Sequence, residues 1–257
     1  MKPVKSRRKW KGILTAAWQK HHYVALGNIL RLSGEPLAFL RRYVFGGGSY
    51  PYRTPVRTPE GTVPAFCKCR DDVMTVNEVF YRLDYEAGGD FRTVVDMGSN
   101  IGLSALFFLT RNPDVFVYLF EPNPANHDGL EENLRPYQAR YRLDKVAVWP
   151  TNGRARFGIE PTGRYGRIDG VRDAYIDVET KAIAEILRGI IAERGGIDVL
   201  KIDTEGSEQE LIKAIPEELL PKIKLILCET RPTEDLLPRF FTQEQYGSVC
   251  RLRQKGG

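Results

Sequence analysis

From Phe91 onward, the sequence alternates between short apolar segments and longer segments whose apolar residues have helical spacing. The apolar segments are typical of buried strands, and the segments between them are long enough for crossover helices. This alternation predicts an α/β fold: a Rossmann-like, doubly wound and mostly parallel sheet with helices on both faces. We expect its strong strands at residues 93–97, 115–121, 145–149, 197–203 and 223–229.

The first third of the chain predicts a helical and β-hairpin extension of this sheet. We expect short helices up to about Phe45, a pair of strands around the turn PEGT, and a lead-in helix at residues 74–89 that ends in glycines. The expected organisation is therefore a basic arm at 1–58, a strand pair with the lead-in helix at 59–90, and a core at 91–257.

Positive charge is concentrated at the start of the chain. Residues 1–57 contain twelve Lys or Arg and one acid, Glu35, which gives a charge of +11, whereas the whole chain has +5. This segment predicts either docking to an anionic membrane surface or other polyanion, or a solvated helical face. Its first apolar stretch is broken by polar residues at 19–22, which argues against a secretory signal, so we expect a cytoplasmic protein, with peripheral membrane association as one option.

The stretch TVVDMGSNIGLSAL, residues 93–106, places an aspartate before a glycine turn. A dinucleotide presents its pyrophosphate to such a turn, and Asp96, two residues before Gly98, would repel it. S-adenosylmethionine fits better because its near end carries an ammonium group that Asp96 can attract. Gly98 and Gly102 let the backbone approach the ligand, and the following helix N-terminus favours the ligand's carboxylate.

Carboxylates also end other predicted strands, which would gather them at one edge of the sheet. Glu121 is placed to accept both ribose hydroxyls of the cofactor. The alternative is that Asp96 and Glu121 only cap helices or pair with surface lysines. The residues that we expect to bind the cofactor are Asp96, Gly98, Ser99, Asn100, Gly102, Glu121, Pro122 and Asn123.

At these residues the chain resembles the FkbM family of class I methyltransferases. The matching segments are VVDMGSNIGLSAL at 94–106, FEPNP at 120–124, VLKIDTEGSEQELI at 199–212 and LILCE at 225–229. The resemblance covers roughly residues 60–235 and implies methylation by S-adenosylmethionine of hydroxyls on sugars, glycans or natural products. Arg231 departs from the histidine that is common in the family at this position.

The reacting hydroxyl would need a base to take up its proton. Because the three histidines lie in the arm or near the adenine side, we expect a carboxylate, with Asp203 as the first candidate. Lys201 shares a face with Asp203 and is interpreted either as a structural ion pair or as a catalytic contact. Glu205 begins the next helix, and Glu229 could complete a Mg²⁺ site, although the spacing does not require a metal.

Three other functions compete with this interpretation. A nucleic-acid methyltransferase is the first, and enzymes of this kind that methylate amino groups carry an Asn/Asp-Pro-Pro-aromatic motif after the fourth strand. This chain has DTEG there, so no specific nucleic-acid motif is present. A non-catalytic binding module and a nicotinamide oxidoreductase are disfavoured by the acids and the glycine turn. The glycine-rich region 152–170, with its arginines, predicts either a lid over the acceptor or an exposed hairpin.

Overall fold

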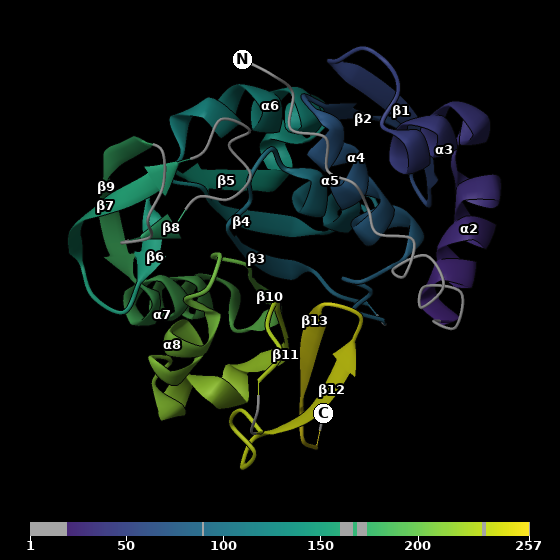
Figure 1. Ribbon diagram of the computed structural model, residues 1–257. Coiled ribbons are helices and arrows are strands. Elements are labelled where there is room, and N and C mark those ends of the chain that lie inside the picture. The colour runs from purple at the N-terminus through teal and green to yellow at the C-terminus, as the bar shows by residue number, and fades with distance from the viewer. Residues whose placement is uncertain (1–19, 89, 160–166, 169–173, 233–234, 257) are drawn as a thin grey trace.

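The computed structural model describes residues 20–88, 90–159, 167–168, 174–232 and 235–256 of the 257-residue chain. A seven-stranded sheet runs through its centre in the order β12-β13-β11-β10-β3-β4-β5 (Figure 1). Its strands are β3 (Thr93–Met97), β4 (Phe116–Phe120), β5 (Tyr141–Asp144), β10 (Ile197–Ile202), β11 (Ile223–Cys228), β12 (Phe241–Tyr246) and β13 (Val249–Gln254).

The order of the strands confirms the expected α/β fold. Neighbouring strands from β11 to β5 are parallel, whereas β13 is antiparallel to both β11 and β12. The chain enters at β3, continues outward through β4 and β5, and later returns to build β10 and β11 on the other side. The strand order therefore reverses between β3 and β10, where ligands bind in sheets of this class.

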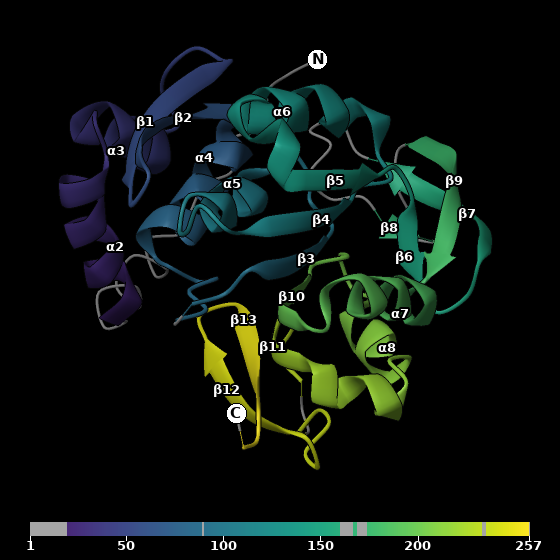
Figure 2. The same cartoon turned by 180° about the vertical axis from the view of Figure 1, so that it is seen from behind.

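Helices cover both faces of the sheet. Helices α5 (Leu103–Leu109) and α6 (Pro124–Leu134) lie on one side, and α7 (Ile183–Arg194) and α8 (Glu208–Lys213) lie on the other (Figure 2). Neighbouring residues of β3 accordingly enter different core clusters, Val94 one and Val95 the other. Burial on both faces explains why the central strands are apolar at nearly every position.

The N-terminal extension contains the predicted helices and hairpin. Helices α2 (Lys20–Leu32) and α3 (Pro36–Phe45) precede β1 (Tyr52–Thr58) and β2 (Gly61–Cys67), which pair antiparallel. This hairpin spans residue 58, and the expected domain limits at 58 and 90 stay predictions. Residues 1–19 of the expected arm, with any short helix expected there, lie outside the described residues.

The lead-in helix differs from its predicted range of 74–89. It begins earlier, as α4 (Arg70–Val76), because the Asp72 carboxylate accepts the backbone N–H groups of Lys68 and Cys69 at 2.6 and 2.9 Å. It continues as a π-helical turn, η1 (Asn77–Tyr81), and ends there. Leu83 then has a backbone φ of 61°, which a continuing helix does not permit.

The prediction of residues 145–149 as the third strand of the central sheet is wrong. The third parallel strand is β5, whose side chains are only half-buried at the sheet edge, so no apolar run marks it. Residues 147–149 form β6 (Ala147–Trp149) of a separate sheet in the order β6-β9-β7-β8. The other strands of this sheet are β7 (Gly153–Ile159), β8 (Arg167–Ile168) and β9 (Ala174–Ala182).

Helix α7 begins only at Ile183, because residues 180–182 pair with β6 as the end of β9. Within the region 152–170, β7 and β8 pair antiparallel, which agrees with a hairpin. Residues 160–166 and 169–170 lie outside the described residues, so the lid stays a prediction. No helix of the described part of the chain is long and apolar enough to cross a membrane.

Candidate active site

A cavity of about 270 Å³ lies beside the carboxyl ends of β3, β4, β10 and β11. Glu121, Asp203 and Glu229 follow directly after β4, β10 and β11, so the sheet brings these three carboxylates to one edge. Nine of the twelve residues singled out in the sequence line the cavity: Gly98, Ser99, Asn100, Glu121, Pro122, Lys201, Asp203, Glu205 and Glu229. The other three, Asp96, Gly102 and Asn123, lie behind its wall.

The glycine turn after β3 is packed tightly against the segment after β10. Gly98 has a φ of 82°, and a Cβ atom on it would lie 1.8 Å from the carbonyl oxygen of Asp203. The Ser99 hydroxyl donates to the Asp96 carbonyl oxygen at 2.8 Å and holds the turn closed. Only glycine fits at position 98, and the turn exposes its backbone to the cavity.

Asp96 does not reach the cavity. Its buried carboxylate accepts the Ser104 hydroxyl at 2.6 Å and the Lys201 ammonium at 2.9 Å. Lys201 also donates to the Gly98 carbonyl oxygen at 3.0 Å and lies 3.4 Å from the Asp203 carboxylate. Burial lowers the pKa of Lys201, but Asp96 and Asp203 outweigh it, so its pKa lies above the usual value. Asp96 thus holds the ammonium group of Lys201, a residue that lines the cavity.

Glu121 is buried and still lines the cavity. Its Oε2 accepts the backbone N–H of Asn100 at 2.8 Å, and its Oε1 accepts the backbone N–H of Asn123 at 2.8 Å and the Asn126 side chain at 3.2 Å. Burial raises the pKa of Glu121 to about 7 against these hydrogen bonds. Asn123 also accepts the N–H of Ala125 and caps α6, as its place before Pro124 predicts.

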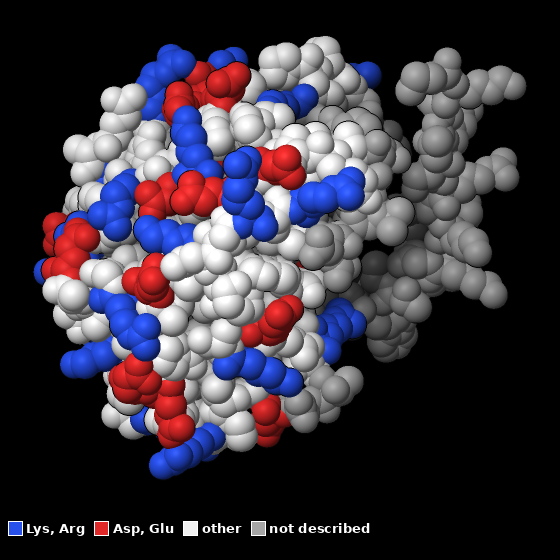
Figure 3. All heavy atoms as spheres, turned by 90° about the vertical axis from the view of Figure 1, so that its left-hand side faces the viewer, with Lys and Arg blue, Asp and Glu red and all other residues white. Residues whose placement is uncertain are grey.

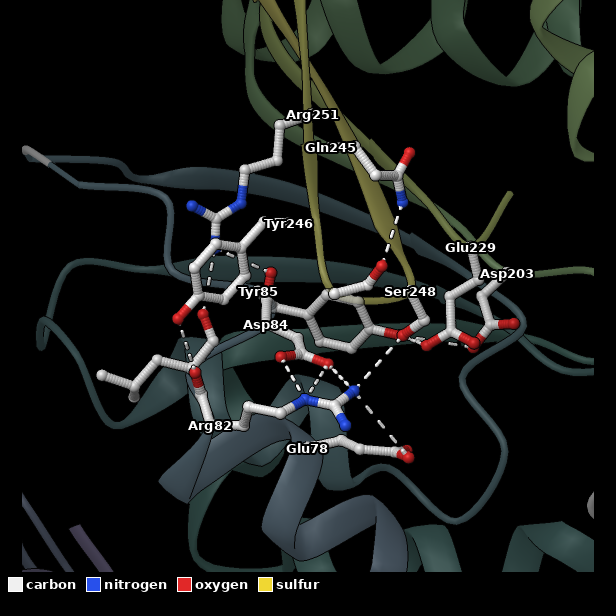
Figure 4. A network of polar contacts seen from close by, with 12 residues as sticks. Glu78, Arg82, Asp84, Tyr85, Asp203, Glu229, Gln245, Tyr246, Ser248 and Arg251 are labelled. Atoms are coloured by element: carbon white, nitrogen blue, oxygen red, sulfur yellow. Dashed lines mark hydrogen bonds and ion pairs between the residues drawn. The ribbon is translucent and has the colours of Figure 1, made fainter. Parts of the chain in front are cut away.

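Asp203 and Glu229 form a carboxylate pair with Tyr85, a residue that the sequence did not single out (Figure 4). The Tyr85 hydroxyl donates to Glu229 Oε1 at 2.6 Å and lies 3.4 Å from Asp203 Oδ2. The charge of Asp203 raises the pKa of Glu229 to about 8, and burial adds to this shift, while the Tyr85 hydrogen bond opposes it. Burial and Glu229 also raise the pKa of the Tyr85 hydroxyl well above its usual value.

Arg82 connects the π-helical turn to the C-terminal hairpin at the same end of the cavity. Its guanidinium pairs with Asp84, donates to the Ser248 hydroxyl at 3.3 Å and lies 4.0 Å from Glu78 (Figure 4). Glu78 and Ser248 both line the cavity. Because segments far apart in the chain form this wall, the sequence pattern did not single out Glu78 or Ser248.

An apolar part of the cavity wall comes from the second sheet, β6-β9-β7-β8. It is formed by Ala147, Val148, Phe157 and Ile168, on β6, β7 and β8. Within the described ranges of the chain, no group of three or more His, Cys, Asp or Glu side chains is arranged to hold a metal ion.

Comparison with known proteins finds similarity to methyltransferases. The family model described as the methyltransferase FkbM domain matches residues 96–249. The 31-O-demethyl-FK506 methyltransferase FkbM of Streptomyces tacrolimicus is 26% identical over 218 residues, which cover 71% of this chain and 83% of that protein. The 2-O-methyltransferase NoeI of Sinorhizobium fredii is 28% identical over 183 residues, covering 60% and 74%.

Among solved structures, a methyltransferase from Geobacter sulfurreducens is similar with 16% identity and a TM-score of 0.39. The similar region covers 67% of this chain and 76% of that one.

Proposed function

Because the chain belongs to the FkbM family of methyltransferases, we propose that it methylates a hydroxyl group of a sugar, a glycan or a natural product. Family membership implies S-adenosylmethionine as the methyl donor. The observation that carries the proposal is a single cavity that joins the glycine turn to the Asp203–Glu229 pair. The two relatives support an oxygen acceptor, since one is named a 31-O-demethyl-FK506 methyltransferase and the other a 2-O-methyltransferase.

The chemistry of the cavity suits this donor better than a dinucleotide. Its described lining contains six acids, which are Asp72, Glu78, Glu121, Asp203, Glu205 and Glu229, and one cation, Lys201. Such a lining favours a ligand with net positive charge and repels a pyrophosphate. When bound, the donor would supply a methyl group already activated by its sulfonium charge.

Residues of the turns after β3 and β4 and of the second sheet would hold the donor. Glu121 Oε2 accepts one hydrogen bond within the protein, and a carboxylate oxygen can accept a second, which a ribose hydroxyl would donate. The backbone of Gly98 and Asn100 would face the amino-acid end, with Ser99, Gly102, Pro122 and Asn123 shaping the two turns. Val148 and Phe157 offer an apolar surface for the adenine ring.

The Asp203–Glu229 pair would receive the proton. The hydroxyl of the acceptor forms a bond to the methyl carbon, the carbon–sulfur bond breaks, and the hydroxyl proton passes to a carboxylate of the pair. With a pKa of about 8, the ionised form of Glu229 is a stronger base than an ordinary carboxylate, and the share of this form grows as the pH rises toward 8. Lys201 holds Asp203 in place, and Glu205, on the same wall, would contact the acceptor. No step in this scheme requires Mg²⁺.

RNA or another polyanion is the alternative acceptor. The acidic lining disfavours it because phosphates near the reacting atoms would face several carboxylates and a single lysine. The basic charge of residues 1–57 therefore needs an explanation other than the acceptor.

Two measurements test the proposal. In calorimetry, the full-length protein should bind S-adenosylhomocysteine and not NADH; the reverse result would refute the donor. With radiolabelled donor and fractionated host extract, the labelled product should be a methyl ether. The Asp203→Asn variant, as the matched control, should bind S-adenosylhomocysteine normally and lose most of the transfer. Label found only on nitrogen or on RNA would refute the hydroxyl acceptor.

A further inference from the structure

The exposed apolar side chains of the protein are concentrated on two helices. Of the eight large hydrophobic residues that are exposed in the described part of the chain, seven lie on α2 and α3. Leu37 and Phe45 are 80% and 81% exposed, far more than a core-facing helix requires. The seven residues are Tyr23, Val24, Leu26, Leu30, Leu37, Val44 and Phe45. A soluble protein rarely leaves such a group open to water unless it binds something.

Helical spacing turns these side chains away from the buried side of each helix. On α3, Leu37, Val44 and Phe45 follow at i, i+7 and i+8, while Phe39 on the other side is buried. On α2, Leu26 and Leu30 point outward, whereas Ala25 and Ile29 pack into the core. Both helices lie at the periphery of the molecule, outside the sheet (Figures 1 and 2).

The exposed charges on the same helices are cationic. Arg31 on α2 is exposed, and Arg41 lies one turn beyond Leu37 on α3. Glu35, between the helices, is the only acid among residues 1–57, and the preceding residues 1–19 add six Lys or Arg. By contrast, the face that carries the second sheet shows blue and red residues interspersed (Figure 3). The excess of positive charge is therefore a property of this end of the chain.

We propose that the α2–α3 face, defined as the seven apolar residues with Arg31 and Arg41, docks on an anionic lipid surface. Apolar side chains inserted at the headgroup boundary and arginines near anionic headgroups are the two contacts that such a surface offers. A second copy of the same face fits less well, because it would bring further arginines and, among residues 1–57, only Glu35 as an acid. RNA offers no apolar surface to the aliphatic residues of this face. The proposal is independent of the methyl acceptor.

Vesicle co-sedimentation of the full-length protein tests the proposal. The protein should bind vesicles of phosphatidylcholine with phosphatidylserine and bind phosphatidylcholine vesicles much more weakly. The Leu37→Ser/Phe45→Ser variant should bind about tenfold more weakly, because it loses the inserted apolar surface. Its control, Tyr175→Ser, removes the exposed aromatic residue that lies elsewhere, on β9, and should bind like the wild type.

The charge contribution is tested separately. Arg31→Gln/Arg41→Gln should weaken binding to the anionic vesicles by about tenfold. Lys222→Gln/Arg239→Gln, which removes the same charge outside these helices, should have little effect. S-adenosylhomocysteine binding should be unchanged in all four variants. The proposal is wrong if the Leu37→Ser/Phe45→Ser variant binds vesicles like the wild type or if the protein binds RNA and no vesicles. It is also wrong if this double substitution only converts a dimer into a monomer.

Discussion

Lys201 and Asp96 are register partners on the adjacent parallel strands β10 and β3, and their side chains form a buried ion pair of 2.9 Å. This pair lies where the strand order of the sheet reverses. The same ammonium group lies 3.4 Å from Asp203, so it connects the interior of the sheet with the cavity wall. A lysine within an apolar strand is thus explained by the aspartate that the neighbouring strand places beside it.

Replacement of Lys201 by methionine should destabilise the protein strongly. The substitution leaves the Asp96 carboxylate buried without a cation, and breaking a buried pair in this way costs roughly 3–5 kcal/mol. Urea unfolding at neutral pH measures the loss. Lys201→Met/Asp96→Asn should recover part of the stability because the uncompensated charge is gone. If the double variant is no more stable than Lys201→Met, the ion pair is not the cause.

Gly98→Ala should damage both folding and cofactor binding. The new Cβ would lie 1.8 Å from the Asp203 carbonyl oxygen, and the φ of 82° is itself unfavourable for alanine. We expect a loss of roughly 2 kcal/mol or more in the free energy of unfolding. Binding of S-adenosylhomocysteine should weaken at least about tenfold.

Gly189→Ala is the matched control for this substitution. Gly189 lies within α7, and a Cβ on it has no heavy atom within 4 Å. Alanine there should raise the unfolding free energy by about 0.5–1 kcal/mol, because glycine is the poorer helix former. Equal losses in the two variants would contradict the close approach of the turn to the segment after β10.

The central part of the sheet could be predicted from the sequence because local signals determine it. The apolar runs of β3, β10 and β11 and the Asn123–Pro124 helix start are encoded within a few residues. The placement of carboxylates at the strand ends also predicted their gathering, since parallel strands share one carboxyl edge. What the pattern did not reveal was that Asp96 faces the buried Lys201 and lies behind the cavity wall.

The parts that could not be predicted depend on long-range packing. Tyr85 is placed next to Glu229 by the fold of a segment 144 residues away in the chain, and Ser248 meets Arg82 from the C-terminal hairpin. The local pattern favours β6 over β5 as the third parallel strand, because β6 is the more apolar of the two. The seven-stranded sheet nevertheless uses β5 as its edge strand. Tertiary context thus decided which residues complete the cavity.

The pKa of the Glu229 carboxyl should move in opposite directions in two variants. Asp203→Asn removes the charge that raises this pKa, so it should fall from about 8 by about 1–2 units. Tyr85→Phe removes the hydrogen bond to the ionised form, so the pKa should rise. Carboxyl-carbon NMR titration measures both without any acceptor. A shift in the same direction in both variants would contradict the proposed triad of Tyr85, Asp203 and Glu229.

Glu229→Gln should stabilise the folded protein at pH 8 while it reduces methyl transfer. In the unfolded chain Glu229 ionises near pH 4.5, whereas in the folded protein it keeps its proton until about pH 8. The folded state therefore binds more protons between these values, and its stability falls as the pH rises through this window. Glutamine removes that loss, so its advantage in unfolding free energy should grow from pH 5 to pH 8 and reach on the order of 2–4 kcal/mol. Glu218→Gln, at an exposed ion pair with Arg188, should gain no such advantage. An advantage that stays constant with pH would show that Glu229 does not retain its proton in the folded protein.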